Sequence, residues 1–212
     1  MMQPTGERSI HRFEVMVAVL MSLTTVLAAW SGFQATKWSG IMAIRFNEAG
    51  ALRSESLRSS NLAATQRAVD VGLFTRWVEA YADGNEDLVR FYEERFPERL
   101  GVAIDAWVGT QPLTNPDAPS SPFAMPEYRL EAEEEAEAYV ERANGKATEA
   151  LEANQNGDNY VLTAVLFASV LLFAGIGSKL ANPRARFGMG ILALVTLVGG
   201  AVVVLTMPII VP

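Results

Sequence analysis

The sequence predicts an all-α membrane protein, with three transmembrane helices and an extracytoplasmic stalk or bundle of long helices inserted between the first and the second. Three apolar stretches of the 212-residue chain are each about 20 residues long, the length that an α-helix needs to cross a bilayer. Between the first two stretches the sequence shows no period-two strand pattern and has small and apolar residues at helical spacing. These observations favour helices throughout.

The three transmembrane helices are expected at 13–33, 158–177 and 187–208. The apolar core of the first, residues 15–32, contains no charged residue. It is longer than the apolar core of a usual signal peptide, and helical character continues beyond it. We therefore expect it to remain as an anchor.

Basic residues predict the orientation of the spans. They gather in an N-terminal arm, 1–12, and in a loop, 178–186, both of which should be cytoplasmic because Lys and Arg are enriched in cytoplasmic segments. Residues 34–157, in which acids outnumber basic residues, then lie outside, as do residues 209–212. The basic residues of the arm and the loop are Arg8, Arg12, Lys179, Arg184 and Arg186.

The region outside the membrane should begin with a helix that continues from the first span to about Ala82, because this stretch contains no proline. Asn85 is placed to cap a short helix that runs to Phe96. Pro97 is expected at the first position of a further short helix, where proline is well tolerated.

A proline-rich segment follows at 112–126, with five prolines in fifteen residues. Proline fixes the backbone and removes a hydrogen-bond donor, so this segment is neither a helix nor a central strand. It is a simple linker or a strap that lies on its own domain or on a neighbouring subunit. The apolar anchors of such a strap are Leu113, Phe123 and Met125.

A second long helix should run from Glu127 into the second span, with a possible break at Gly157. Small residues recur along it at alternating spacings of four and three, which is typical of a close-packed coiled-coil seam; they include Ala136, Ala143 and Ala147. Its opposite face is rich in glutamates, which indicates a solvated face and, as a minor alternative, a cation site. Some of these glutamates should pair with arginines of the first long helix: Arg45, Arg53, Arg58, Arg67 and Arg76.

Composition excludes several classes of protein. The chain has no cysteine, hence no disulfide and no thiolate chemistry, and its net charge of −7 argues against nucleic-acid binding. It shows no phosphate-binding loop, metalloprotease helix or nucleophile elbow. We expect no enzymatic activity, no cofactor and no metal, and no catalytic residue is predicted.

Small residues on the first span predict close helix packing. Ala28, Gly32, Thr36 and Gly40 recur every four residues, the spacing that lets membrane helices approach closely. They should serve packing within the chain, self-association, or both. Aromatic anchors at the membrane interface are expected at Trp30, Trp38 and Tyr160.

Four segments carry a resemblance: AWSGFQATKWSG, RFPERLGVAIDAW, PLTNPDAPSSPFAMPEYR and GDNYVLTAVLFASVLLFAGI. In them, and over nearly its whole length, the chain resembles an uncharacterised family of small bacterial inner-membrane proteins with three transmembrane helices. The resemblance implies a location in the bacterial inner membrane. It transfers no functional residue.

The leading hypothesis is a non-enzymatic membrane protein that acts through protein–protein contacts, as a homo-oligomeric scaffold or an accessory subunit. Its partners would be the lipid bilayer and either further copies of itself or another membrane protein. The alternative is a homo-oligomeric ion channel with an acidic external vestibule. Its pore would be lined by Ser22, Thr25 and Ser31.

Overall fold

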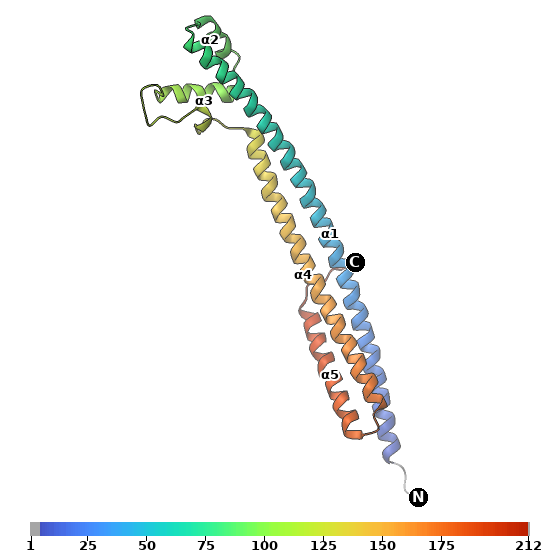
Figure 1. The fold of residues 1–212 in the computed structure, drawn as a ribbon. Coiled ribbons are helices and arrows are strands. Elements are labelled where there is room, and N and C mark those ends of the chain that lie inside the picture. Colours follow the sequence, from blue (N-terminus) through green and yellow to red (C-terminus); the bar gives the residue numbers. More distant parts are fainter. Residues whose placement is uncertain (1–4, 212) are drawn as a thin grey trace. The chain divides into compact units, whose positions relative to one another are not determined.

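The computed structural model describes the backbone of residues 5–211 and the side chains of residues 14–211. It contains five α-helices, one 3-10 turn and, within the described residues, no strand (Figure 1). The prediction of an all-α fold is confirmed. The elements are α1 (Thr5–Ala82), α2 (Glu86–Glu93), α3 (Glu98–Gly109), η1 (Pro122–Ala124), α4 (Glu131–Lys179) and α5 (Pro183–Thr206).

Three of these helices, α1, α4 and α5, are long and apolar enough to cross a membrane. This confirms the three predicted candidates. The connection between α4 and α5 is shorter than the predicted loop, since α4 continues to Lys179 and α5 begins at Pro183. Asn182 caps α5 by accepting a hydrogen bond from the backbone N–H of Arg184, and Pro183 is preset for the first helical position.

The short helices differ from expectation by a few residues. Asn85 caps α2 as predicted, by accepting from the Leu88 N–H at 3.1 Å, but α2 ends at Glu93 instead of Phe96. Pro97 has φ −53° and ψ 142°, so it precedes the first helical residue of α3 and does not occupy that position.

The second long helix, α4, begins at Glu131 and not at Glu127. The reason is that the residues just before it are used in tertiary contacts, with Tyr128 and Leu130 both buried in a hydrophobic cluster. No break occurs at Gly157. This glycine lies where α4 packs on α1, and a Cβ there would make an ordinary contact, 3.6 Å from the carbonyl oxygen of Ala35.

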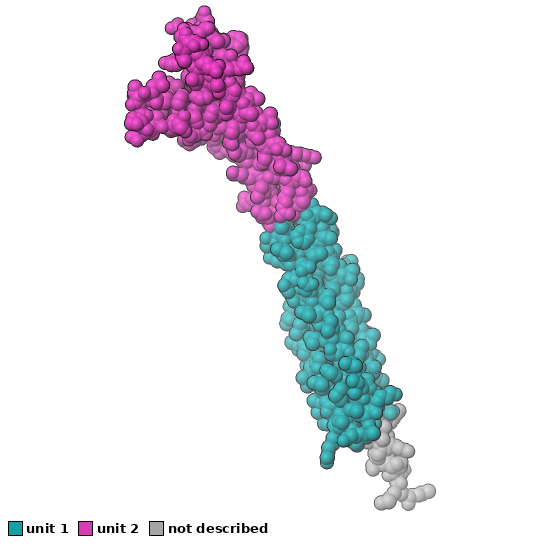
Figure 2. All heavy atoms as spheres, viewed as in Figure 1, with its two compact units in different colours: residues 1–47, 146–212 teal, residues 48–145 magenta. Residues whose placement is uncertain are grey.

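The chain divides into two compact units, which Figure 2 colours separately. Residues 1–47 and 146–212 form the three-helix unit, in which α1, α4 and α5 lie alongside one another (Figure 1). Its core contains Tyr160, Phe167 and Val170, none of which is exposed. Residues 48–145 form the second unit, called here the helical head.

In the helical head, buried positions of α1 recur every seven residues. They are occupied by small or polar side chains as well as by a tryptophan: Ala49, Ser56, Ala63, Asp70 and Trp77. Opposite them, α4 buries Ala132, Ala136 and Ala143, while Ala147 of the three-helix unit is half-buried. A seven-residue period of small residues lets two antiparallel helices pack closely along their length.

Candidate functional site

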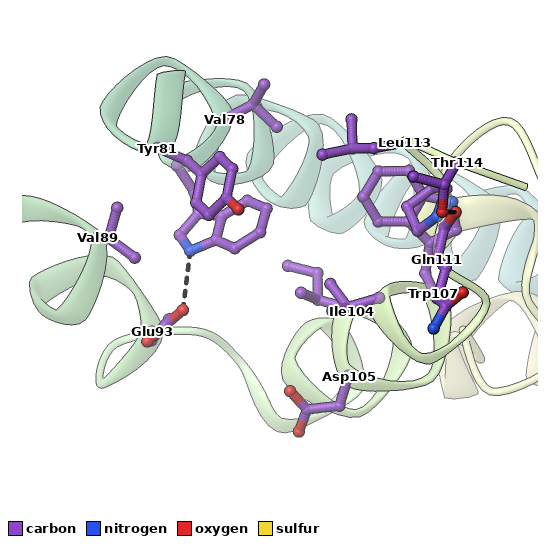
Figure 3. Close-up of a pocket in the computed structure, with 13 residues that line it drawn as sticks. Val78, Tyr81, Val89, Glu93, Ile104, Asp105, Trp107, Gln111, Leu113 and Thr114 are labelled. Atoms are coloured by element: carbon purple, nitrogen blue, oxygen red, sulfur yellow. Dashed lines mark hydrogen bonds between the residues drawn. The ribbon is translucent and has the colours of Figure 1, made fainter. Parts of the chain in front are cut away.

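The helical head contains a cavity of about 570 Å³ (Figure 3). Its walls come from the last two turns of α1, from α2, from the second half of α3 and from the start of the proline-rich segment. The lining residues are Trp77, Val78, Tyr81, Val89, Glu93, Ile104, Asp105, Trp107, Val108, Gln111, Pro112, Leu113 and Thr114.

Hydrogen bonds fix the two tryptophans of the cavity. The Trp77 Nε1–H donates to Glu93 Oε1 at 3.1 Å, the bond drawn dashed in Figure 3. The Trp107 Nε1–H donates to the carbonyl oxygen of Pro119 at 2.7 Å. Both rings also contact Phe74, Trp77 in a stacked arrangement and Trp107 edge-on. The aromatic walls are therefore preformed.

The charged groups of the cavity are both acidic. Glu93 and Asp105 lie on one side of it, whereas Val78 and Leu113 lie on the other (Figure 3). Of the thirteen described residues that line the cavity, none is basic. Asp105 makes no side-chain hydrogen bond or ion pair within the described part of the chain.

The proline-rich segment is held by some of its predicted anchors and not by others. The Phe123 ring packs edge-on against Phe74 and Tyr128, with centroids 5.6 and 5.0 Å apart, and Met125 is half-buried. Leu113 does not anchor the segment on its own unit, because its side chain is 84% exposed. Gln111, with φ 54°, ends α3 and turns the chain, so that Leu113 lies on the cavity rim.

A network of hydrogen bonds and an ion pair connects three parts of the head through Asp70, Arg99 and Tyr128. Asp70 of α1 is completely buried, and its carboxylate accepts from Arg99 Nε at 2.7 Å and from Arg99 Nη2 at 3.0 Å. The Tyr128 hydroxyl donates to Asp70 Oδ2 at 2.9 Å. This network connects α1, α3 and the segment before α4.

Within the head the pKa of Tyr128 is raised from 10.0 to about 12. Burial, which disfavours the phenolate, is the largest cause, and the hydrogen bond to Asp70 and the Asp70 charge act in the same direction. Because this pKa is higher in the folded state, the folded state holds the proton more tightly. The resulting stabilisation is complete below pH 10 and is lost as the pH rises from 10 to about 12.

We therefore expect the head to lose stability between pH 10 and 12 through Tyr128, and Tyr128→Phe to reduce this loss. The measurement is the urea midpoint of the full-length protein at pH 8 and pH 11, followed by hydrogen exchange of the α3 amides. If the midpoint of Tyr128→Phe falls as steeply as that of the wild type, Tyr128 does not carry the alkaline transition.

Ion pairs between the two long helices are fewer than expected. Arg67 pairs with Glu133 at 2.7 Å in the head, and Arg45 pairs with Glu149 at 2.9 Å in the three-helix unit. The expected cross-helix pair of Arg58 is wrong, since Arg58 binds Glu55 one turn away on its own helix, at 2.8 Å.

The glutamates at the start of α4 have separate partners. Glu134 accepts from Arg129 Nε at 2.7 Å, and Glu135 accepts from the Ser59 hydroxyl at 3.0 Å. Together with the pairing of Glu133, these contacts hold the carboxylates apart. Among the described residues, no group of three acidic or histidine side chains is arranged to hold a metal ion.

In the three-helix unit, the residues after α5 are tied to the other two helices. The side chain of Gln34, which is completely buried, donates to the carbonyl oxygen of Ile210 at 3.0 Å and accepts from its N–H at 3.1 Å. Trp38 Nε1–H and the Tyr160 hydroxyl both donate to the carbonyl oxygen of Pro208, at 3.3 and 3.2 Å.

These bonds change the interpretation of the aromatic anchors. Tyr160 is completely buried within the chain, so its ring does not face the membrane interface as expected. Trp38 is half-buried, and its indole points to the 207–210 tail. Trp30, 37% exposed, is the one of the three that remains on the surface, where it contacts Phe33.

The candidate pore-lining residues do not share one face. Ser22 and Thr25 are exposed, and their hydroxyls donate to the carbonyls of Ala18 and Met21 on the same helix. Ser31 is completely buried, and its Oγ has no hydrogen-bond partner among the described residues. The three residues therefore cannot line a single pore.

The small residues predicted to pack on the first span lie mostly on the surface. Ala28 is half-buried against the core, but Gly32, Thr36 and Gly40 are exposed. A Cβ added at Gly32 or Gly40 would meet nothing within 4 Å. The prediction that these two glycines pack within the chain is thus wrong. The prediction that they serve self-association stays a prediction.

Comparisons with protein-family models, with curated proteins and with solved structures found no match for the chain. The resemblance to small bacterial inner-membrane proteins stays a prediction.

Proposed function

We propose that this protein is a non-enzymatic scaffold or accessory subunit of the bacterial inner membrane, which acts through contacts with further copies of itself or with another membrane protein. One observation carries the proposal. Gly32, Thr36 and Gly40 form a surface of small side chains on α1 that no other part of the described chain covers.

Gly32 lies at the end of the expected span 13–33, where a surface of this kind is of little use against lipid, and Thr36 and Gly40 continue it beyond the span. Hydrocarbon tails pack against any apolar side chain, so a helix face that meets only lipid has no need of glycine. Helices that associate in a membrane use small residues, because these let their backbones approach and gain van der Waals contact. The exposed small face of α1 extends towards the N-terminus through Ser22 and Thr25.

The interior of the three-helix unit supports a scaffold more than a pore within one chain. Phe167 and Val170 fill its centre, and both are completely buried. Thr24 and Thr163, also buried, donate their hydroxyl hydrogens to backbone carbonyls of Leu20 and Asn159 at 2.6 Å. These hydroxyls are thereby satisfied without water.

The proposed orientation follows from the basic residues. The α4–α5 connection is flanked by Lys179, Arg184 and Arg186, and positive charge favours the cytoplasmic side. On this basis the helical head lies outside the cytoplasm, where it would meet periplasmic or extracellular partners.

The test is Gly32→Leu in the full-length protein, reconstituted in nanodiscs or gentle detergent. We expect the leucine to keep a second helix at a distance and to shift native mass spectra towards smaller assemblies. Gly199→Leu on α5 is the matched control, since a side chain there also meets nothing within 4 Å. A wild-type protein that is monomeric and without a partner, or equal assembly of both variants, contradicts the proposal.

A homo-oligomeric channel remains the second candidate, favoured by the exposed hydroxyl-bearing residues Ser22 and Thr25 on the same small face. If copies of this face surrounded an axis, they would line a narrow polar path. Ion flux into liposomes that falls with Ser22→Val and Thr25→Val would support the channel. Flux no greater than that of empty liposomes would exclude it.

A further inference from the structure

We propose that the cavity of the helical head binds a small organic cation, a molecule with one ammonium group on a compact aromatic or aliphatic body. This inference goes beyond the scaffold function and does not depend on self-association. It rests on the size, the charge and the aromatic walls of the cavity.

The cavity has the dimensions of a small-molecule site. Its volume of about 570 Å³ lies within the range of about 300–1,000 Å³ that is usual for such sites. Two of its lining residues, Ile104 and Trp77, are only 4% and 8% exposed. A ligand that enters it exchanges water for a preformed apolar surface.

Charge selects the class of ligand. Glu93 and Asp105 are the charged lining residues, and they lie on the same side of the cavity (Figure 3). Glu93 is positioned by its bond to Trp77, and its Oε2 has no hydrogen bond to any described residue. An ammonium group near these carboxylates is favoured, whereas a carboxylate or phosphate is repelled.

The ends of the helices add to this negative potential. The cavity is lined by the last two turns of α1, by Val89 and Glu93 of α2 and by the C-terminal half of α3, so that the C-termini of α1 and α3 lie at its wall. Helix C-termini carry partial negative charge and favour cations. Neither α1 nor α3 has a basic residue in its last turn, and Arg90 of α2 does not line the cavity.

Aromatic rings provide the third contribution. Tyr81 and Trp107 line the cavity beside Trp77, whose own ring is stacked against Phe74 and Tyr81. The faces of aromatic rings attract ammonium groups. Sites that recognise quaternary ammonium ions are built from several aromatic rings. A cation with an apolar body matches both halves of this lining: the acidic side, and the apolar side with Val78 and Leu113.

The test uses isothermal titration of the full-length protein in nanodiscs of zwitterionic lipid, with empty nanodiscs as the blank. The probes share a benzyl or phenyl group and differ in charge: benzyltrimethylammonium, benzyl alcohol and benzenesulfonate. We expect the ammonium probe to bind, the neutral probe to bind more weakly and the anion not to bind. Asp105→Asn and Glu93→Gln should each weaken ammonium binding about tenfold, the loss of one charge–charge contact.

Asp117→Asn is the matched control, because Asp117 lies in the same unit outside the cavity lining. It should bind the ammonium probe as the wild type does, and circular dichroism should show all variants equally folded. Equal affinity for the three probes, or unchanged binding when both cavity carboxylates are neutralised, would overturn the proposal. A third result would also overturn it: a photo-crosslinking residue at position 113 that captures a protein while the ammonium probe does not bind. The cavity would then be a docking site for a protein.

Discussion

Replacing Arg99 by leucine should unfold or strongly destabilise the helical head, at a cost of about 3–5 kcal/mol. The reason is the position of its partner: Asp70 is completely buried and receives two hydrogen bonds from the guanidinium. Without Arg99 the carboxylate keeps only the Tyr128 hydroxyl and loses the positive charge that compensates its burial. Urea denaturation of the full-length protein, with hydrogen exchange of the α3 amides as local probe, measures the loss.

Arg67→Leu is the control for this prediction. Arg67 also pairs with an acid on another helix, Glu133, but the two side chains are 48% and 46% exposed. Exposed pairs contribute only about 0–1 kcal/mol. If both variants lost the same stability, burial of Asp70 would not be the source of the effect.

Replacing Gly200 by valine should destabilise the three-helix unit by about 1–3 kcal/mol, the usual cost of overpacking. A Cβ at this position would lie 2.8 Å from Cε1 of Phe167, closer than atoms in packed proteins approach. Phe167 is completely buried and cannot move aside without displacing its neighbours on α4 and α5. The measurement is the thermal unfolding of the reconstituted protein.

The neighbouring residue provides the control. Gly199→Val meets nothing within 4 Å and should change stability by less than about 0.5 kcal/mol. Phe167→Leu introduced together with Gly200→Val should restore part of the loss, because the smaller side chain makes room. Equal effects at positions 199 and 200 would show that the steric conflict with Phe167 is not decisive.

The sequence was sufficient for the helices because the signals that define them are local. Each apolar run is continuous in the sequence, the Asn85 side chain caps α2 three residues away, and Pro97 directly precedes α3. Where boundaries moved, tertiary contacts were responsible. Tyr128 and Leu130, for example, are drawn into the core of the head and delay the start of α4.

The candidate site could not be predicted in the same way, since its residues come from separate elements. The same holds for the ionic network of the head: Asp70, Arg99 and Tyr128 are each ordinary in sequence, and only the packing of α1, α3 and the segment before α4 brings them together. One signal was present: the seven-residue period of α1 that places Ala63, Asp70 and Trp77 on one buried face. A carboxylate at a buried position of this seven-residue period indicates that a basic or hydrogen-bonding side chain lies next to it in the folded protein.

The hydrogen bonds of the 207–210 tail restrict how a signal could cross the membrane. Gln34, Trp38 and Tyr160 together make four bonds to two residues beyond α5. A piston movement of α1 by one helical rise, about 1.5 Å, would strain or break those of Gln34 and Trp38. At about 0.5–1.5 kcal/mol each, these bonds make sliding of α1 unfavourable. We therefore expect the three helices to tilt or rotate together, as one rigid body. A change on one side of the membrane would then reach the other side through altered contacts between neighbouring three-helix units.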